Sequence, residues 1–224
     1  MTIPRPPAGV VLDLDGTLVD TVGTRIEAWL RTFAEEGIKA DRQLVTELIG
    51  SDGKHLARTI CESAGAEVDD ERAERIDARS GAIYSELNTD PQPLPGVTEF
   101  LGALDAAGIP WAIGTSSRRE QVGRSVEALH LDRQPTIVDG SAVTRAKPHP
   151  DLLLAACEAL GVDPADSWCV GDSTWDMRAA SAAGMAGIAV LAGSAISADV
   201  LRASGAVEVV QTLADLISLI QSPA

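Results

Sequence analysis

The sequence predicts an α/β fold in three layers, in which a parallel sheet is covered by helices on both faces and an all-helical module is inserted after the first strand. Two observations lead to this prediction. From Leu94 onward, short apolar runs alternate with amphipathic stretches that have helical spacing. Between residues 21 and 88, by contrast, the apolar residues recur only with helical spacing.

The first predicted strand covers residues 9–14, a nearly continuous apolar run that is typical of a strand buried on both faces. Further apolar runs of similar length follow later in the chain. Amphipathic stretches separate them, for example at residues 97–104 and 152–160. The other predicted strands are residues 111–114, 136–138, 167–170, 187–191 and 207–210.

The inserted module carries four apolar stripes with helical spacing, and glycines separate them. The stripes lie within residues 22–33, 44–49, 56–64 and 73–87. A proline-rich segment at residues 90–96 then leads back to the α/β part as a stiff, extended linker. We therefore predict a core domain formed by residues 1–20 and 91–224, and a helical cap domain formed by residues 21–90.

Composition excludes several classes of function. The formal net charge of -15 argues against nucleic acid or an anionic membrane as a partner, because both require basic surfaces. Any anionic substrate must therefore bind at a locally positive site. The cysteines Cys61, Cys157 and Cys169 have no metal-binding spacing, and the chain shows neither a signal sequence nor a run of about 18 apolar residues. These features predict a soluble cytoplasmic protein.

The first candidate site follows the first strand, where Asp13 and Asp15 are separated by one residue. Residues i and i+2 of a strand share a face, so the two carboxylates point the same way if the strand continues. At about 4 Å and an effective dielectric constant near 20, they repel each other by about 4 kcal/mol. A divalent cation with a phosphate group relieves this repulsion. On this motif alone, a polar turn after a buried strand remains the alternative.

Further polar clusters follow other predicted strands, at the edge where open parallel sheets bind ligands. Taken singly, each has an ordinary structural explanation. The hydroxyl and acidic clusters fit helix N-caps, and the lysine fits a solvated surface position. Their joint occurrence in this order favours one shared site. The clusters are Thr115-Ser116-Ser117, Lys147, and Asp172 with Asp176.

These clusters resemble the four motifs of the haloacid dehalogenase (HAD) superfamily of phosphohydrolases, and the resemblance covers essentially the whole chain. The first motif matches residues 13–17, the second Thr115, the third Lys147 and the fourth residues 171–176. The resemblance implies a Rossmann-like core. The inserted helical module is similar to the α-helical cap of phosphoglycolate-phosphatase-like members.

The resemblance also implies a phosphatase mechanism. Asp13 is expected to attack phosphorus and form an aspartyl-phosphate, while Asp15 protonates the leaving oxygen and then activates water. Mg²⁺ is expected on Asp13, the backbone carbonyl of Asp15 and Asp172, with Asp176 as a further ligand or as a residue that orients water or Lys147.

The phosphate itself is expected to bind to the second and third motifs. The resemblance assigns its non-bridging oxygens to the Thr115 hydroxyl and the Ser116 backbone N–H. Lys147 is expected to neutralise the transferring phosphoryl group and to relieve the repulsion between Asp13 and Asp15.

Substrate specificity is expected to lie in a cap loop at residues 50–55, which in similar proteins closes over the site. The expected substrate is a small phosphorylated metabolite and the expected assembly a monomer or homodimer. The presence of Asp15 argues against dehalogenation. Two alternatives remain: a sugar phosphomutase of the same superfamily, and a non-catalytic phosphate-binding regulatory protein. The candidate specificity residues are Gly50, Asp52, Lys54 and His55.

Overall fold

The computed structural model describes Ile3 and residues 6–221, and its centre is a six-stranded sheet with the strand order β3-β2-β1-β4-β5-β6. All neighbouring strands pair in parallel. The strand order changes direction between β1 and β4, which is where sheets of this type bind ligands. The strands are β1 (Val10–Leu12), β2 (Trp111–Gly114), β3 (Thr136–Val138), β4 (Trp168–Gly171), β5 (Ala186–Val190) and β6 (Glu208–Val210).

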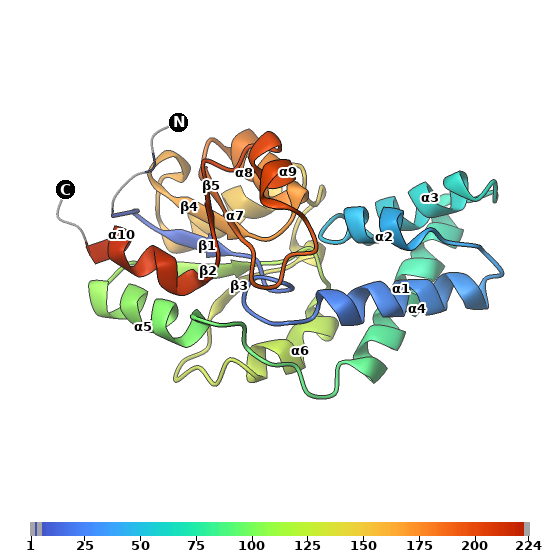
Figure 1. Cartoon of the computed structure of the whole chain (residues 1–224), viewed down its shortest axis with the longest axis horizontal. Coiled ribbons are helices and arrows are strands. Elements are labelled where there is room, and N and C mark those ends of the chain that lie inside the picture. The colour runs from blue at the N-terminus through green and yellow to red at the C-terminus, as the bar shows by residue number, and fades with distance from the viewer. Residues whose placement is uncertain (1–2, 4–5, 222–224) are drawn as a thin grey trace.

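Helices cover both faces of this sheet (Figure 1). One face packs against α5 (Val97–Ala107), α6 (Arg119–Glu127) and α10 (Ile217–Gln221). The other face packs against α7 (Asp151–Leu160), α8 (Thr174–Ala183) and α9 (Ala198–Ala203). Short 3-10 turns are η1 (Gly140–Ala142), η2 (Pro164–Asp166) and η3 (Leu213–Leu216).

Alternating side chains of the strands build the two interfaces. In β1, Val10 and Leu12 belong to the apolar cluster on the α5 side, whereas Val11 belongs to the cluster on the α7 side. In β4, Trp168 likewise faces the α5 side and Cys169 the α7 side. This period of two, with apolar residues on both faces, explains why the strands are continuous apolar runs in the sequence. The predicted three-layer α/β/α fold is confirmed.

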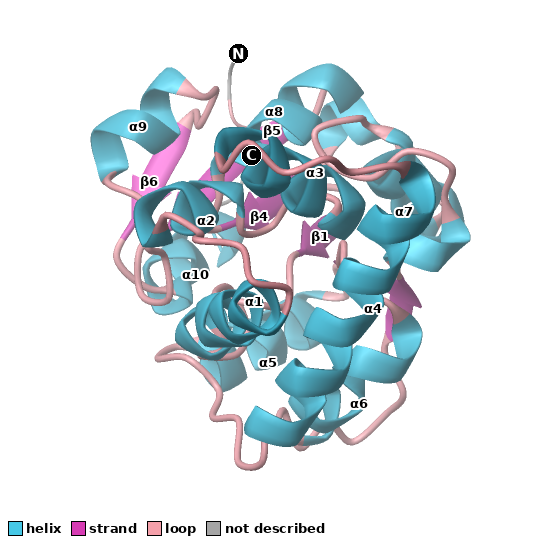
Figure 2. Ribbon diagram, turned by 90° about the vertical axis from the view of Figure 1, so that its right-hand side faces the viewer, coloured by secondary structure: helices cyan, strands magenta, loops and turns pink. Residues whose placement is uncertain are grey.

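The helices between β1 and α5 form a separate lobe, which we call the cap (Figure 1). Figure 2 views the molecule from this side, with α1 and α4 in front of the sheet. All four predicted helical stripes are helices, and they share one apolar cluster. The domain limits at 20/21 and 90/91 stay a prediction. The cap helices are α1 (Val22–Glu35), α2 (Arg42–Leu48), α3 (Gly53–Ser63) and α4 (Asp70–Leu87).

The segment at residues 50–55, which we expected to be a loop, is partly helical. Helix α3 begins at Gly53, because the Asp52 carboxylate accepts a hydrogen bond from the backbone N–H of His55 at 2.9 Å and caps the helix. Lys54 and His55 therefore lie in the first turn of α3. Among the described residues, no helix is both long enough and apolar enough to span a bilayer.

Candidate active site

The predicted polar clusters meet at the carboxyl edge of the sheet, and Lys147 lies at their centre. Its Nζ is 2.7 Å from Asp13 Oδ1 and 2.6 Å from Asp176 Oδ1, and it donates a hydrogen bond to the Gly114 carbonyl at 2.9 Å. Only 2% of Lys147 is exposed, so it is not a solvated surface lysine. Burial alone lowers the pKa of Lys147, but the charges of Asp13 and Asp176 outweigh burial and raise it. Lys147 is therefore a fixed positive charge.

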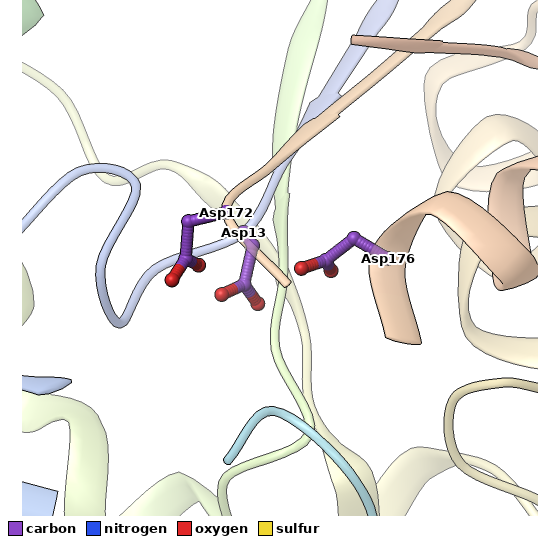
Figure 3. A group of neighbouring side chains, drawn as sticks. All are labelled: Asp13, Asp172 and Asp176. Atoms are coloured by element: carbon purple, nitrogen blue, oxygen red, sulfur yellow. The ribbon is translucent and has the colours of Figure 1, made fainter. Parts of the chain in front are cut away.

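Three buried carboxylates lie at the same edge of the sheet, and Figure 3 shows how their side chains point toward one another. Asp13, Asp172 and Asp176 each offer an oxygen, and these atoms lie within 4.8 Å of one another. Burial raises the pKa of Asp13 to about 7 against the lowering effect of Lys147. Burial and the charges of Asp176 and Asp13 raise the pKa of Asp172 well above its ordinary value. Such a set of crowded, hard oxygen donors fits a small divalent cation such as Mg²⁺.

The two aspartates of the fourth motif are held in different ways. Asp172 Oδ1 accepts a hydrogen bond from the Thr17 hydroxyl at 3.2 Å. Asp176 instead forms a capping box at the start of α8: its Oδ2 accepts hydrogen bonds from the Ser173 backbone N–H at 3.1 Å and from Ser173 Oγ at 2.5 Å. The N-cap of α8 is therefore Ser173, and Asp172 remains directed at the acidic cluster.

Asp15 points away from the other acidic groups and forms its own network. Its Oδ1 accepts hydrogen bonds from the Thr21 hydroxyl at 2.5 Å and the Tyr84 hydroxyl at 3.1 Å. Its Oδ2 accepts hydrogen bonds from Arg25 and from the Ser117 hydroxyl, each at 2.9 Å. Burial alone would raise the pKa of Asp15, but the Arg25 charge and the hydrogen bonds from Thr21, Arg25 and Ser117 lower it.

The counter-charge of Asp15 corrects one expectation from the sequence. We expected Lys147 to relieve the repulsion between Asp13 and Asp15. In the structure Lys147 pairs with Asp13, whereas Arg25 forms the ion pair with Asp15. The reason is geometric: the side chain of Asp15 turns toward the cap, and its charge is balanced by helix α1 of the cap.

Arg25 is a site residue that sequence reasoning missed. Its guanidinium lies over the ring of Tyr84 at 3.4 Å and also donates a hydrogen bond to Gln121 at 3.2 Å. The available signal was its position, one helical turn after Thr21 on the helix that follows the aspartate pair. Sequence reasoning also missed Tyr84, the one tyrosine of the chain, because it lies among the buried apolar positions of α4.

The residues of the second motif do not cap helix α6, whose N-cap is Arg118. Thr115 is buried, and its Oγ1 accepts a hydrogen bond from the backbone N–H of Ser117 at 3.1 Å. Ser116 Oγ donates a hydrogen bond to the carbonyl of Gly50 in the cap at 3.0 Å. The second motif therefore lies where core and cap meet. The phosphate-binding roles of Thr115 and Ser116 stay a prediction.

A cavity of about 340 Å³ lies between core and cap, within the size range of small-molecule sites. Of the candidate specificity residues, Gly50, Asp52 and Lys54 line it. His55 is not among the lining residues, because the helical start of α3 directs its ring edge-on to Trp175, with ring centroids 5.5 Å apart. The core contributes Asp13, Asp15, Thr115 and Ser116 to the lining.

A parallel α/β core with clustered carboxylates at its switch point and a helical cap over them defines a class of hydrolases. Residues 10–190 match the family model described as haloacid dehalogenase-like hydrolase, and the chain belongs to this family. A crystal structure of a hydrolase from Pseudomonas syringae superposes with a TM-score of 0.88 and 31% identity, covering 94% of this chain and 96% of that one.

Two curated relatives specify the reaction type. A phosphoglycolate phosphatase from Nitrosospira multiformis is 34% identical over 190 residues, covering 82% of this chain and 83% of the relative. A fructose-1-phosphate phosphatase from Escherichia coli is 30% identical over 179 residues, covering 80% and 93%. The chain is accordingly a phosphoric monoester hydrolase that resembles the phosphoglycolate phosphatases.

Proposed function

We propose that this enzyme hydrolyses the phosphate monoester of a small metabolite through an aspartyl-phosphate intermediate and depends on Mg²⁺. One observation carries the proposal: Asp13 lines the cavity, is paired with the buried Lys147 and belongs to the cluster of three carboxylates. A carboxylate in this setting is a suitable nucleophile toward phosphorus. Asp13 would attack the phosphorus atom, and the leaving oxygen would depart toward the cap.

The surrounding residues would stabilise the charge of the transferring group. Lys147 places a fixed positive charge beside Asp13, and Thr115 and Ser116 would donate hydrogen bonds to the phosphoryl oxygens. Asp13 and Asp172 would hold Mg²⁺, with the backbone carbonyl of Asp15 as a further ligand and one oxygen of Asp176 nearby. When bound, the ion neutralises charge on the phosphoryl group and orients it for in-line attack.

Asp15 would act as the acid and base. It lines the same cavity as Asp13, two residues further along the chain. It would give a proton to the leaving oxygen and then take one from the water that hydrolyses the aspartyl-phosphate. Because Arg25 and hydrogen bonds from neighbouring side chains keep the pKa of Asp15 low, the acid role requires the substrate to displace at least one of these hydrogen bonds, so that Asp15 takes up a proton before it donates one.

We further propose that the enzyme is cytoplasmic, acts as a monomer or homodimer, and has no nucleic-acid or membrane partner. Cys61, Cys157 and Cys169 are buried free thiols, which supports a reducing compartment. The net charge of -15 opposes binding to polyanions.

The test is turnover of p-nitrophenyl phosphate with Mg²⁺ and with EDTA. We expect release of free phosphate that EDTA abolishes and excess Mg²⁺ restores, and a loss on the order of 10⁴-fold in Asp13→Asn. The control is Glu35→Gln, which removes an exposed cap ion pair with Arg79. Full activity of Asp13→Asn would contradict the covalent mechanism, and full activity in EDTA would contradict the metal requirement. Isomerised sugar phosphate without free phosphate would indicate the mutase. No turnover of any ester would indicate a binding protein.

A further inference from the structure

The lining of the cavity is rich in charged groups, but its basic side chains are already paired with carboxylates. Three basic residues line the cavity: Arg25, Lys54 and Arg118. Each forms an ion pair with a carboxylate that also lines it. These pairs decide which chemical groups a bound substrate meets beyond its phosphate.

Arg118 and Lys54 share the acidic residues of α4. The Arg118 guanidinium, at the N-cap of α6 in the core, donates hydrogen bonds to Glu74 and to Asp77, the latter at 2.8 Å. Lys54 Nζ lies 3.6 Å from the other oxygen of Glu74. Both cations therefore have their charge balanced within the cavity wall.

The remaining charges leave the wall acidic. Arg25 forms an ion pair with Asp15, which also lines the cavity. Asp52 adds a carboxylate that has one oxygen engaged in capping α3. Acidic residues in the described lining outnumber basic ones by five to three. They are Asp13, Asp15, Asp52, Glu74 and Asp77 against Arg25, Lys54 and Arg118.

Among the described residues that line the cavity, every basic side chain already has an ion-pair partner. A substrate carboxylate would therefore find no free cation there. It would have to displace Glu74 or Asp77 from Arg118 while lying close to both, and like charges at such distances repel. Hydroxyl groups face no such cost, because each both donates and accepts hydrogen bonds. They match a wall in which carboxylate acceptors alternate with guanidinium and ammonium donors.

Two glycines leave room for polar side chains of the cavity lining. A Cβ at residue 53 would lie 1.9 Å from Asp77 Oδ1, and a Cβ at residue 81 would lie 2.0 Å from Gln121 Nε2. Gly53 and Gly81 therefore let two polar side chains of the lining pack against the helices. Any larger residue at either position would push these groups from their places.

We propose that the leaving group is uncharged and polyhydroxylated, so that the substrate is a sugar phosphate and not a carboxylate-bearing phosphate. This inference rests on the proposed phosphatase function. Asp52, Asp77 and Arg118 would bind the sugar hydroxyls, while the phosphate lies at Asp13 and Lys147. The cavity volume of about 340 Å³ accommodates a sugar beside the phosphate.

The first test compares kcat/KM for fructose 1-phosphate, glucose 6-phosphate and ribose 5-phosphate with that for 2-phosphoglycolate, using p-nitrophenyl phosphate as the reference. We expect the best sugar phosphate to exceed 2-phosphoglycolate by about tenfold or more. Turnover of p-nitrophenyl phosphate with no sugar phosphate above 2-phosphoglycolate would overturn the inference alone. Turnover of none of these esters would overturn the proposed function, and this inference with it.

The second test frees the cation of Arg118. In the double variant Glu74→Gln/Asp77→Asn, we expect the kcat/KM ratio of 2-phosphoglycolate to sugar phosphate to rise by about tenfold, and circular dichroism reports whether the variant is folded. The single variant Asp77→Asn should move the ratio in the same direction and covers a folding failure of the double variant. Glu35→Gln is the matched control, because it breaks an Arg–Glu pair on α1 and α4 outside the cavity lining. An unchanged ratio in both acidic-residue variants would overturn the inference.

Discussion

The core and the cap both hold charged groups at the site but hold them differently. In the core, the side chains of Lys147 and Asp176 are each 1% exposed, and Nζ lies 2.6 Å from Oδ1. In the cap, the carboxylate of Glu74 is 44% exposed and shares two cations. Burial makes the first arrangement rigid and costly to alter, whereas solvent weakens the second. The proposed chemistry therefore depends on the rigid core, and the proposed selection of the leaving group depends on a part that tolerates change.

Among the variants that compare core and cap, the largest effect is expected at Asp15, where the two lobes meet. In Asp15→Ala we expect kcat/KM on an alkyl phosphate to fall by about 10²- to 10⁴-fold, because the leaving oxygen loses its proton donor. The loss on p-nitrophenyl phosphate should be smaller, since that leaving group departs without help. Steady-state kinetics on both esters measures this, with the exposed Asp20→Ala as control. Equal losses on both esters would contradict the acid role.

Lys147→Met tests how much the buried ion pairs of the core contribute to stability. Removing this charge leaves the buried carboxylates of Asp13 and Asp176 without their partner, which should lower the free energy of unfolding by about 3–5 kcal/mol. Lys54→Met removes a 42% exposed lysine from the cap wall and should cost less than about 1 kcal/mol. Denaturant titrations compare the two variants. Similar losses of unfolding free energy in Lys147→Met and Lys54→Met would show that the ion pairs of the core and of the cap are equally rigid.

Gly50→Ala tests the contact between the cap and the core. Gly50 has φ +90°, and a Cβ there would lie 2.7 Å from Ser173 Oγ. We expect a loss of about 1–3 kcal/mol in stability and a reduced kcat. Gly37→Ala is the matched control, because it has φ +70° but open space around the Cβ position. It should cost about 1 kcal/mol and leave kcat unchanged. Thermal unfolding measures the stability of both variants, and steady-state turnover measures their kcat. A loss of kcat in Gly37→Ala would show that the loss in Gly50→Ala does not come from the contact with Ser173.

Tyr84→Phe should have the smallest effect. The variant keeps the ring under Arg25 but loses a hydroxyl that hydrogen-bonds to Asp15 and accepts from Asn88 at 2.9 Å. Because the buried Asn88 loses one acceptor, we expect a destabilisation of about 1–2 kcal/mol. Chemical denaturation checks the value, and an unchanged stability would show that this network contributes nothing net.

The fold could be predicted from the sequence because its signals are local. The buried strands are short apolar runs, and each cap helix has one apolar face, so element type follows from periodicity alone. Element ends depend on single side chains: Asp52 caps α3, which begins at Gly53, three residues before the predicted helical stripe at 56–64. The order of the strands depends on long-range packing and could not be derived from any one segment.

The candidate site likewise contains residues that could be predicted from the sequence and residues that could not. Asp13, Lys147 and Asp172 lie after β1, β3 and β4, so the carboxyl edge of the parallel sheet brings them together. Arg25 and Arg118 could not be identified from the sequence, since an arginine on a helix or at its start is ordinarily a surface residue. Their partners come from the other lobe and are fixed only when the cap packs on the core.

Trp175 has a consequence for how such enzymes diversify. This residue belongs to the core helix α8, yet its ring packs in the apolar cluster of the cap and its indole N–H donates a hydrogen bond to the Glu47 carbonyl at 3.0 Å. A cap transplanted from a relative would therefore need a recess that fits this indole. Exchange of whole caps is therefore constrained by this side chain of the core, which also contacts His55 of α3.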